Sequence, residues 1–316
     1  MRKFGRADLQ AETFEKTVAG HTTRLTVLPN LGADLVSLQV DGREFVHFDP
    51  EILLAERPHM RGCFQMFPSP CRLTNSSYVF EGREIHQRKH GEDYFIHGLV
   101  RDESFAITRT EDALMASLEW DRTHPIYEGF PWEGALTTAF RPIARGLEIR
   151  WAFQNRSDAN APAGYGLHPF WAVPGVREDT FVKAPAEYRL ELVDYTDQRP
   201  TGAALPVGGT HYDLREWRSL RDLYLDDIYW PKPADQEAGV LFREEGIRLA
   251  IQCSDNMKHM VCYSPEGQSF VCVENLSCSP DGQNLYARGL TELSGLAVVP
   301  PGETLAGWVR YRVEDS

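Results

Sequence analysis

Long apolar runs and clusters of basic residues are both missing from this sequence. No window of its 316 residues has the length and apolar composition of a membrane span. The net charge is −13, and the sequence has no run of Lys and Arg like those that follow a phosphate backbone. We therefore expect neither a membrane nor a nucleic acid as a partner.

Targeting signals, paired cysteines and common catalytic motifs are also absent. Residues 1–10 carry basic residues without an apolar stretch behind them, so we expect no secretory signal and a cytoplasmic location. The six cysteines lack C-x-x-C or zinc-like spacing, which argues against a disulfide framework. Cys253, Cys262 and Cys272 are expected to be buried reduced thiols, whereas pairing of Cys63 with Cys71 stays open. The sequence contains no G-x-S-x-G, H-E-x-x-H or P-loop motif.

Several segments of the sequence show apolar and polar residues that alternate with a period of two. Alternating runs flank short turns in four predicted hairpins, and a fifth alternating run lies near the C-terminus, at 308–313. The hairpins are predicted over residues 35–46, 78–85, 135–153 and 240–251. One short helix is predicted over 213–220, with Leu214, Trp217 and Leu220 on one face. The pattern favours an all-β fold, a large antiparallel β-sandwich in a single domain over residues 1–316.

Two ionisable residues stand among apolar neighbours. His168 follows a Gly-Tyr-Gly segment and precedes a proline, which restricts its backbone to extended conformations. Glu274 ends the apolar run 270–273 and begins a loop, where a strand end can present a carboxylate. Isolated charges are costly in such surroundings. The two are therefore either a satisfied core histidine and a surface glutamate, or an acid–base pair that the fold brings together.

Three further positions carry polar groups beside apolar segments. Arg72 lies in a proline-rich turn, His97 ends the apolar run 94–96, and Asp226 and Asp227 stand between aromatic residues. Taken alone, these positions are better explained as a surface cation, a packing histidine and a solvated acidic pair, respectively.

The order of these features resembles the aldose 1-epimerase (galactose mutarotase-like) family. The matching residues are, in chain order, Arg72, His97-Gly98, His168-Pro169-Phe170, Asp226 with Tyr229, Glu274 with Pro280-Asp281 and Asn284, and Pro301-Gly302-Glu303. The resemblance runs from about Thr22 to Val313 and implies a large antiparallel β-sandwich with a sugar site on one sheet. Cys71 and Phe170 stand where the family often has Asn and Tyr, which leaves the identity of the sugar open.

The resemblance implies an isomerase that interconverts the α and β anomers of a free aldose through the open-chain aldehyde. Glu274 is the expected base and His168 the expected acid, with no metal and no organic cofactor. The expected sugar-binding residues are Arg72, His97 and Asp226. The expected partner is a small-molecule aldose, and the protein is expected to be a monomer or a homodimer.

Two details of the expected site stay open. Asp226 is preferred to Asp227 because an aromatic residue, Tyr229, follows it by three positions. Phe170, Trp171 and Tyr229 can either stack on the apolar face of a pyranose or pack in the core.

Other functions also remain open. A hexose-6-phosphate 1-epimerase would need at least two cations at the phosphate, and the candidates are Arg72, Arg101, Arg61 and Lys89. A non-catalytic sugar-binding protein on the same fold would have no need of a matched acid and base. A glycoside hydrolase would use two carboxylates, Glu274 and Asp226, and would leave the histidine without a role.

Overall fold

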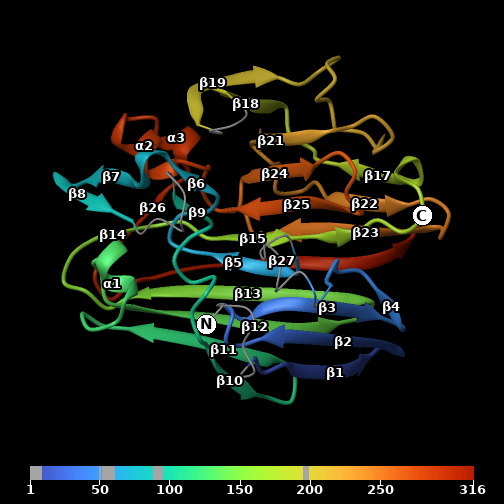
Figure 1. The fold of residues 1–316 in the computed structure, drawn as a ribbon, viewed down its shortest axis with the longest axis horizontal. Helices are drawn as coiled ribbons and strands as arrows, with labels where there is room; N and C mark the ends of the chain where they lie inside the picture. Colours follow the sequence, from blue (N-terminus) through green and yellow to red (C-terminus); the bar gives the residue numbers. More distant parts are fainter. Residues whose placement is uncertain (1–8, 50, 52–60, 88–94, 195–198) are drawn as a thin grey trace.

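The computed structural model of the chain describes residues 9–49, 51, 61–87, 95–194 and 199–316. Two large antiparallel sheets dominate the fold (Figure 1), which confirms the predicted all-β class. Strands account for about 51% of the described residues and helices for about 7%. Among the described residues, no helix is both long and apolar enough to cross a membrane.

The larger sheet has nine strands in the described part of the chain. Its longest hairpin, β12–β13, pairs ten residues of each strand, and its turn at Ala144-Arg145 lies one residue before the turn predicted at Arg145-Gly146. In spatial order the strands are β10 (Ala106–Arg109), β11 (Leu114–Trp120), β12 (Gly134–Ile143), β13 (Gly146–Asn155), β27 (Thr304–Asp315), β23 (Ile247–Cys253), β22 (Ala238–Phe242), β17 (Thr180–Lys183) and β20 (Arg218–Ser219).

The second sheet has eight strands among the described residues and carries the residues that the sequence singles out. A short strand, β16 (Trp171–Ala172), pairs with β25 beside the main path. The main path runs through β19 (Pro200–Pro206), β18 (Tyr188–Leu192), β21 (Leu225–Trp230), β24 (His259–Ser264), β25 (Phe270–Leu276), β15 (Gly166–Pro169) and β5 (Cys63–Met66).

Smaller elements surround the two sheets. The helices are short and lie at one end of the strands, on the left of Figure 1. They are α1 (Ile126–Gly129), α2 (Gly282–Ala287) and α3 (Thr291–Ser294). Elsewhere in the described part of the chain there are two 3-10 turns, η2 (Thr74–Ser76) and η3 (Arg177–Asp179). A four-stranded sheet consists of β1 (Glu12–Val18), β2 (His21–Leu28), β3 (Asp34–Val40) and β4 (Arg43–Glu44). The remaining pairs are β6 (Arg72–Leu73) with β9 (Phe95–Ile96), β7 (Ser77–Phe80) with β8 (Arg83–His86), and β14 (Ala161–Ala163) with β26 (Ala297–Val299).

All four predicted hairpins and the final alternating strand are present. They correspond to β3–β4, β7–β8, β12–β13 and β22–β23, and to β27. In the first, Asp41 and Gly42 both have positive φ, 51° and 86°, as a tight hairpin turn requires. All six cysteines are buried and none forms a disulfide, which confirms the expected thiols and excludes a bridge between Cys63 and Cys71.

Alternation along β25 separates the main core from a second apolar cluster. Val271 and Val273 belong to the core, which also contains residues of the nine-stranded sheet. Cys272 and Leu276 belong to the second cluster, together with Phe64 of β5. Because successive side chains of a strand point to opposite faces, β25 presents Glu274 on the face of the second cluster.

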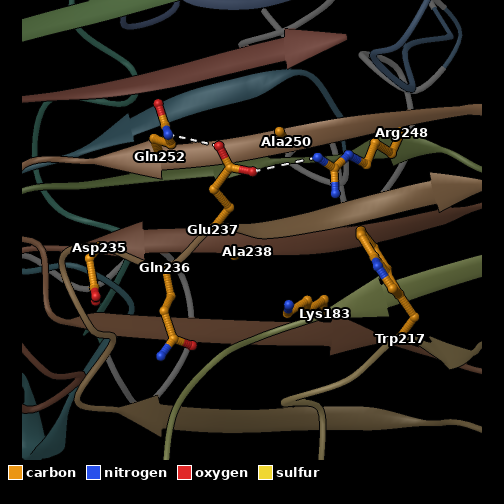
Figure 2. Close-up of a pocket in the computed structure, with 9 residues that line it drawn as sticks. All are labelled: Lys183, Trp217, Asp235, Gln236, Glu237, Ala238, Arg248, Ala250 and Gln252. Atoms are coloured by element: carbon orange, nitrogen blue, oxygen red, sulfur yellow. Dashed lines mark hydrogen bonds and ion pairs between the residues drawn. The ribbon is translucent and has the colours of Figure 1, made fainter. Parts of the chain in front are cut away.

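Polar side chains cover the outer face of the nine-stranded sheet. Glu237 accepts a hydrogen bond from Gln252 Nε2 at 2.7 Å and lies 3.9 Å from Arg248 Nη2 (Figure 2). Arg312 of β27 approaches the same carboxylate at 3.3 Å. This network orders the charged groups above β22, β23 and β27.

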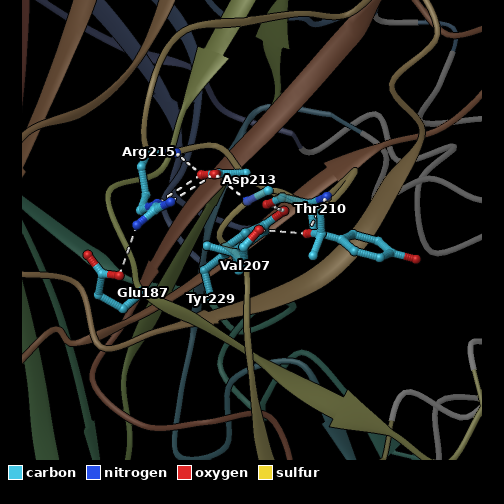
Figure 3. Close-up of polar contacts among 8 residues, drawn as sticks. Glu187, Val207, Thr210, Asp213, Arg215 and Tyr229 are labelled. Carbon is cyan, nitrogen blue, oxygen red and sulfur yellow. Dashed lines mark hydrogen bonds and ion pairs between the residues drawn. The ribbon is translucent and has the colours of Figure 1, made fainter.

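The predicted helix over 213–220 is wrong. This segment consists of irregular chain and bends followed by β20, which pairs Arg218 and Ser219 with β17. The Asp213 carboxylate accepts hydrogen bonds from the amide of Gly209 at 3.1 Å and from Nε of Arg215 at 2.9 Å (Figure 3). Asp213 therefore closes a local turn instead of capping a helix, and pairing of Arg218 with β17 prevents the helix from continuing.

Gly98 occupies a place where only glycine fits. Its φ is 69°, and a Cβ there would lie 2.4 Å from the backbone nitrogen of Phe67. A left-handed backbone conformation alone costs an alanine about 1–2 kcal/mol. We expect Gly98→Ala to lower the Tm by more than this cost implies, because the Cβ would also clash with backbone atoms of Phe67, which cannot easily move aside. Thermal unfolding followed by circular dichroism measures this loss.

Gly82→Ala is the matched control. Gly82 has a φ of 77°, and no atom lies within 4 Å of the position that its Cβ would take. We expect Gly82→Ala to lose only the stability that the left-handed backbone conformation costs an alanine. Equal losses of Tm in the two variants would show that the contact with Phe67 imposes no constraint.

Candidate active site

The register between β15 and β25 places His168 opposite Glu274. Leu167 pairs with Asn275, and Trp171, beyond the end of β15, pairs with Val271. Between these two pairs the same antiparallel register sets His168 opposite Glu274. His168 Nε2 lies 3.2 Å from Glu274 Oε1. Their side chains are 7% and 1% exposed. The structure thus brings together the two residues that the sequence marks as a possible acid–base pair.

Three aromatic rings hold the His168 imidazole. Phe170 stacks on it at 4.6 Å with an interplanar angle of 8°, and Phe64 lies at 4.8 Å. His97 meets it edge-on at 5.0 Å and 87°. Phe64 is not marked as a site residue by the sequence. The signal available was its place in the short apolar run before Pro68, but nothing in the sequence pairs β5 with β15.

The second oxygen of Glu274 meets a thiol. Cys71 Sγ donates a hydrogen bond to Oε2 at 3.6 Å. Burial raises the pKa of Glu274 well above its ordinary value of 4.5, and the negative charge of Asp226 raises this pKa further, whereas the hydrogen bond from Cys71 lowers it. The site therefore makes Glu274 a stronger base than an exposed glutamate, which suits a group that must accept a proton and return it.

The two neighbouring aspartates face opposite sides of β21. Asp226 pairs with Tyr263, and Tyr263 pairs with Cys272, so Asp226 shares a face with Glu274. Asp227 is buried on the other face, 3.3 Å from Arg189. Strand alternation thus places Asp226 on the side of the candidate site and gives Asp227 a structural ion pair.

Arg72 and His97 come from one short pair of strands. β6 pairs with β9 through Arg72 and Ile96, and the amide of His97 donates to the carbonyl of Cys71 at 2.7 Å. The His97 ring lies beside Met66, with 3.3 Å between Nδ1 and Sδ. Both residues are half-buried. This pair of strands therefore brings His97 against His168 and sets Arg72 next to the thiol that contacts Glu274.

The loop after β25 braces the same segment. Asp281 Oδ1 accepts hydrogen bonds from the amide of Thr74 at 2.9 Å and from Nδ2 of Asn284 at 2.8 Å. The amide of Asp281 in turn donates to the carbonyl of Arg72 at 2.9 Å. The Asp281 and Asn284 of the family resemblance thus support the backbone on which Arg72 stands.

The aromatic candidates for sugar stacking divide between two environments. Trp171 is fully buried against Tyr311, and Tyr229 is fully buried in the core, where its hydroxyl donates to the carbonyl of Tyr212. Both belong to the core cluster. Phe170 alone of the three lies on the face of His168.

Two of the four candidate phosphate-binding cations, Arg61 and Arg101, face carboxylates. Arg61 is buried with its Nε 3.4 Å from Asp34, and Arg101 is buried with its Nη2 3.7 Å from Asp102. Lys89 lies outside the described residues.

The residues that the structure describes include no cluster of three or more metal-ligating side chains.

Comparison with known proteins identifies the family. The model of the family described as "Aldose 1-epimerase" matches residues 17–312. The chain belongs to the aldose 1-epimerase family. No curated protein matches it.

Solved structures related to this family member share its fold. A galactose mutarotase-like protein from Clostridium acetobutylicum aligns with a TM-score of 0.81 and 17% identity, over 98% of this chain and 100% of that one. A putative aldose 1-epimerase from Escherichia coli K12 has a TM-score of 0.80 and 17% identity, over 97% and 100%. The galactose 1-epimerase from Lactobacillus acidophilus has a TM-score of 0.73 and 16% identity, over 98% and 100%. At these identities the likeness shows the fold alone.

The raised pKa of Glu274 makes a prediction about stability. A carboxyl whose pKa is higher in the folded than in the unfolded state contributes stability below pH 4.5, and this contribution is lost as the pH rises toward the folded value. Glu274→Gln removes the charge and keeps the shape. We expect its Tm to exceed that of the unmodified protein at pH 7.5 and the difference to shrink at pH 4.5, as measured by calorimetry.

Glu292→Gln is the control, because Glu292 is exposed in α3. This variant should leave the Tm nearly unchanged at both pH values. A lower Tm for Glu274→Gln at pH 7.5 would mean that the contact with His168 stabilises the charge by more than burial costs.

Proposed function

We propose that this protein is an aldose 1-epimerase that interconverts the α and β anomers of a free aldose. The observation that carries the proposal is the 3.2 Å contact between His168 Nε2 and Glu274 Oε1. Mutarotation exchanges protons at the C1 hydroxyl and at the ring oxygen, and these two oxygens share one carbon. An acid and a base that serve them must therefore lie side by side.

The proposed reaction begins with ring opening. Glu274, as a carboxylate, takes the proton of the C1 hydroxyl, and the electron pair of that O–H bond forms the C1 carbonyl. The C1–O5 bond breaks, and the imidazolium of His168 gives its proton to O5. Rotation about the C1–C2 bond then presents the other face of the aldehyde, and the ring closes with both proton transfers reversed.

The remaining residues of the site orient the sugar in this proposal. Arg72, His97 and Asp226 offer polar groups to its hydroxyls from the half-buried edge of the site. We propose a free aldose because the guanidinium groups of Arg61 and Arg101 already face carboxylates. A phosphate would have to compete with Asp34 and Asp102 for them.

Activity measurements test the acid and the base. We expect the protein to accelerate the polarimetric decay of freshly dissolved α-D-galactose or α-D-glucose. His168→Ala and Glu274→Gln should each reduce kcat by about 10²–10⁴-fold, the usual contribution of one positioned proton-transfer group. His86→Ala, at an exposed histidine of β8, should leave the rate unchanged.

The alternative functions give different results. Acceleration by both variants at the original rate would contradict the roles of His168 and Glu274. Acceleration by the unmodified protein only with glucose 6-phosphate, measured by exchange NMR, would favour the phosphosugar enzyme. Binding of aldoses without acceleration would identify a sugar-binding protein.

The pH dependence of kcat/KM should report on Glu274 and its two neighbours. Only the ionised carboxylate accepts a proton, so kcat/KM should fall as the pH drops through the raised pKa of Glu274. Asp226→Asn removes a negative charge and should move this acid limb to lower pH. Cys71→Ala removes the hydrogen bond that lowers the pKa and should move it to higher pH. Shifts in the same direction would contradict the assigned contacts.

A further inference from the structure

A groove with no part in the proposed reaction lies on the outer face of the nine-stranded sheet. Its volume is about 370 Å³, near the lower end of the range of small-molecule sites, about 300–1,000 Å³. We call it the Trp217 groove. Its principal residues are Lys183, Trp217, Asp235, Gln236, Glu237 and Arg248 (Figure 2).

A small residue, Ala250, lies on the floor of the Trp217 groove. Gly239 of β22 lies directly opposite Ala250 of β23, and Lys183 of β17 lies opposite Gly239 on the other side. Directly opposite residues share a face of the sheet, so this row has almost no side-chain bulk at its centre. Trp217 covers the glycine of this row, so a flat ring can approach the sheet surface beside the indole, over Ala250.

The indole of Trp217 closes one end of the floor. A Cβ on Gly239 would lie 3.0 Å from Trp217 Cη2, so the ring packs onto the glycine. The side chain is half-buried. Figure 2 shows the indole at one end of the groove, near Lys183 and Arg248, with Asp235 and Gln236 toward the other end.

The polar groups around the groove are partly fixed and partly uncommitted. Glu237 is held by Gln252 at 2.7 Å and by Arg312 at 3.3 Å. By contrast, the side chains of Lys183, Asp235 and Gln236 make no hydrogen bond or ion pair with any described residue. The groove thus offers an ammonium, a carboxylate and an amide for a ligand.

We propose that the Trp217 groove binds a neutral saccharide through one of its pyranose rings. The C–H face of a pyranose is apolar and fits against an indole and a small-residue floor. Its hydroxyls both donate and accept, as the three uncommitted side chains require. Counting the ion-pair partners of the lining residues, the cations Lys183, Arg248 and Arg312 balance the anions Asp235, Glu237 and Glu314, so the groove does not favour an anionic ligand.

Two-dimensional ¹H–¹⁵N NMR of the full chain tests this inference. The probes are methyl β-D-glucopyranoside and methyl β-D-galactopyranoside, whose C1 is capped and cannot be epimerised. The indole Nε1–H signal of Trp217, assigned by its loss in Trp217→Phe, should shift with a Kd of about 1 mM. Lys183→Ala and Gln236→Ala should each weaken binding by about tenfold.

Two internal comparisons make the result specific. Trp308 lies on the same outer face of the sheet, against Arg310, and its indole signal should not move. Glu274→Gln should leave the shift of Trp217 intact, so the result is independent of the proposed catalytic function.

Three results would overturn the inference. They are no shift of the Trp217 signal with either glycoside, a shift that Lys183→Ala and Gln236→Ala leave unchanged, and a shift with sodium phosphate but not with the glycosides.

Discussion

The register between β15 and β25 is the constraint on which the candidate site depends. It sets Leu167 opposite Asn275 and Trp171 opposite Val271, and so places His168 against Glu274. A slip of one residue would turn every side chain of a strand to the other face. The valines of β25 would then leave the core and the carboxyl would enter it. The hydrogen bonds that hold the sheet together therefore also position the two ionisable side chains.

The surroundings of Glu274 keep a carboxyl basic at the expense of stability. Its neighbours include two sulfur groups, Cys71 and Cys272, and the thiol of Cys71 is a weak donor compared with an amide or a guanidinium. A carboxylate that receives several strong hydrogen bonds loses its basicity. Burial, the largest cause, outweighs the hydrogen bond from Cys71 and keeps the pKa of Glu274 raised.

Much of the fold follows from local patterns in the sequence, and the site follows only in part. Hairpins with short turns, such as the one that turns at Asp41 and Gly42, depend on neighbouring residues and are readable from the sequence. The choice between Asp226 and Asp227 depends on pairing across β21, β24 and β25, which no local pattern encodes.

The wrong prediction at 213–220 has a similar cause. Its apolar spacing fits a helix, but the pairing partner of Arg218 lies in β17, far away in the sequence. The contacts of Phe64 and Met66 with the two histidines also arise only when distant strands meet. Single polar residues can thus be marked from the sequence, whereas the apolar side chains that hold them are found only in the folded chain.

The left-handed backbone at His97 and Gly98 has a thermodynamic consequence for recognition. Two successive residues with φ of 66° and 69°, closed against the backbone of Phe67, leave this corner few alternative conformations. A ligand that meets the His97 ring has little backbone entropy to remove there. Whatever contact energy His97 provides is therefore available for affinity, since the cost of ordering was met when the chain folded.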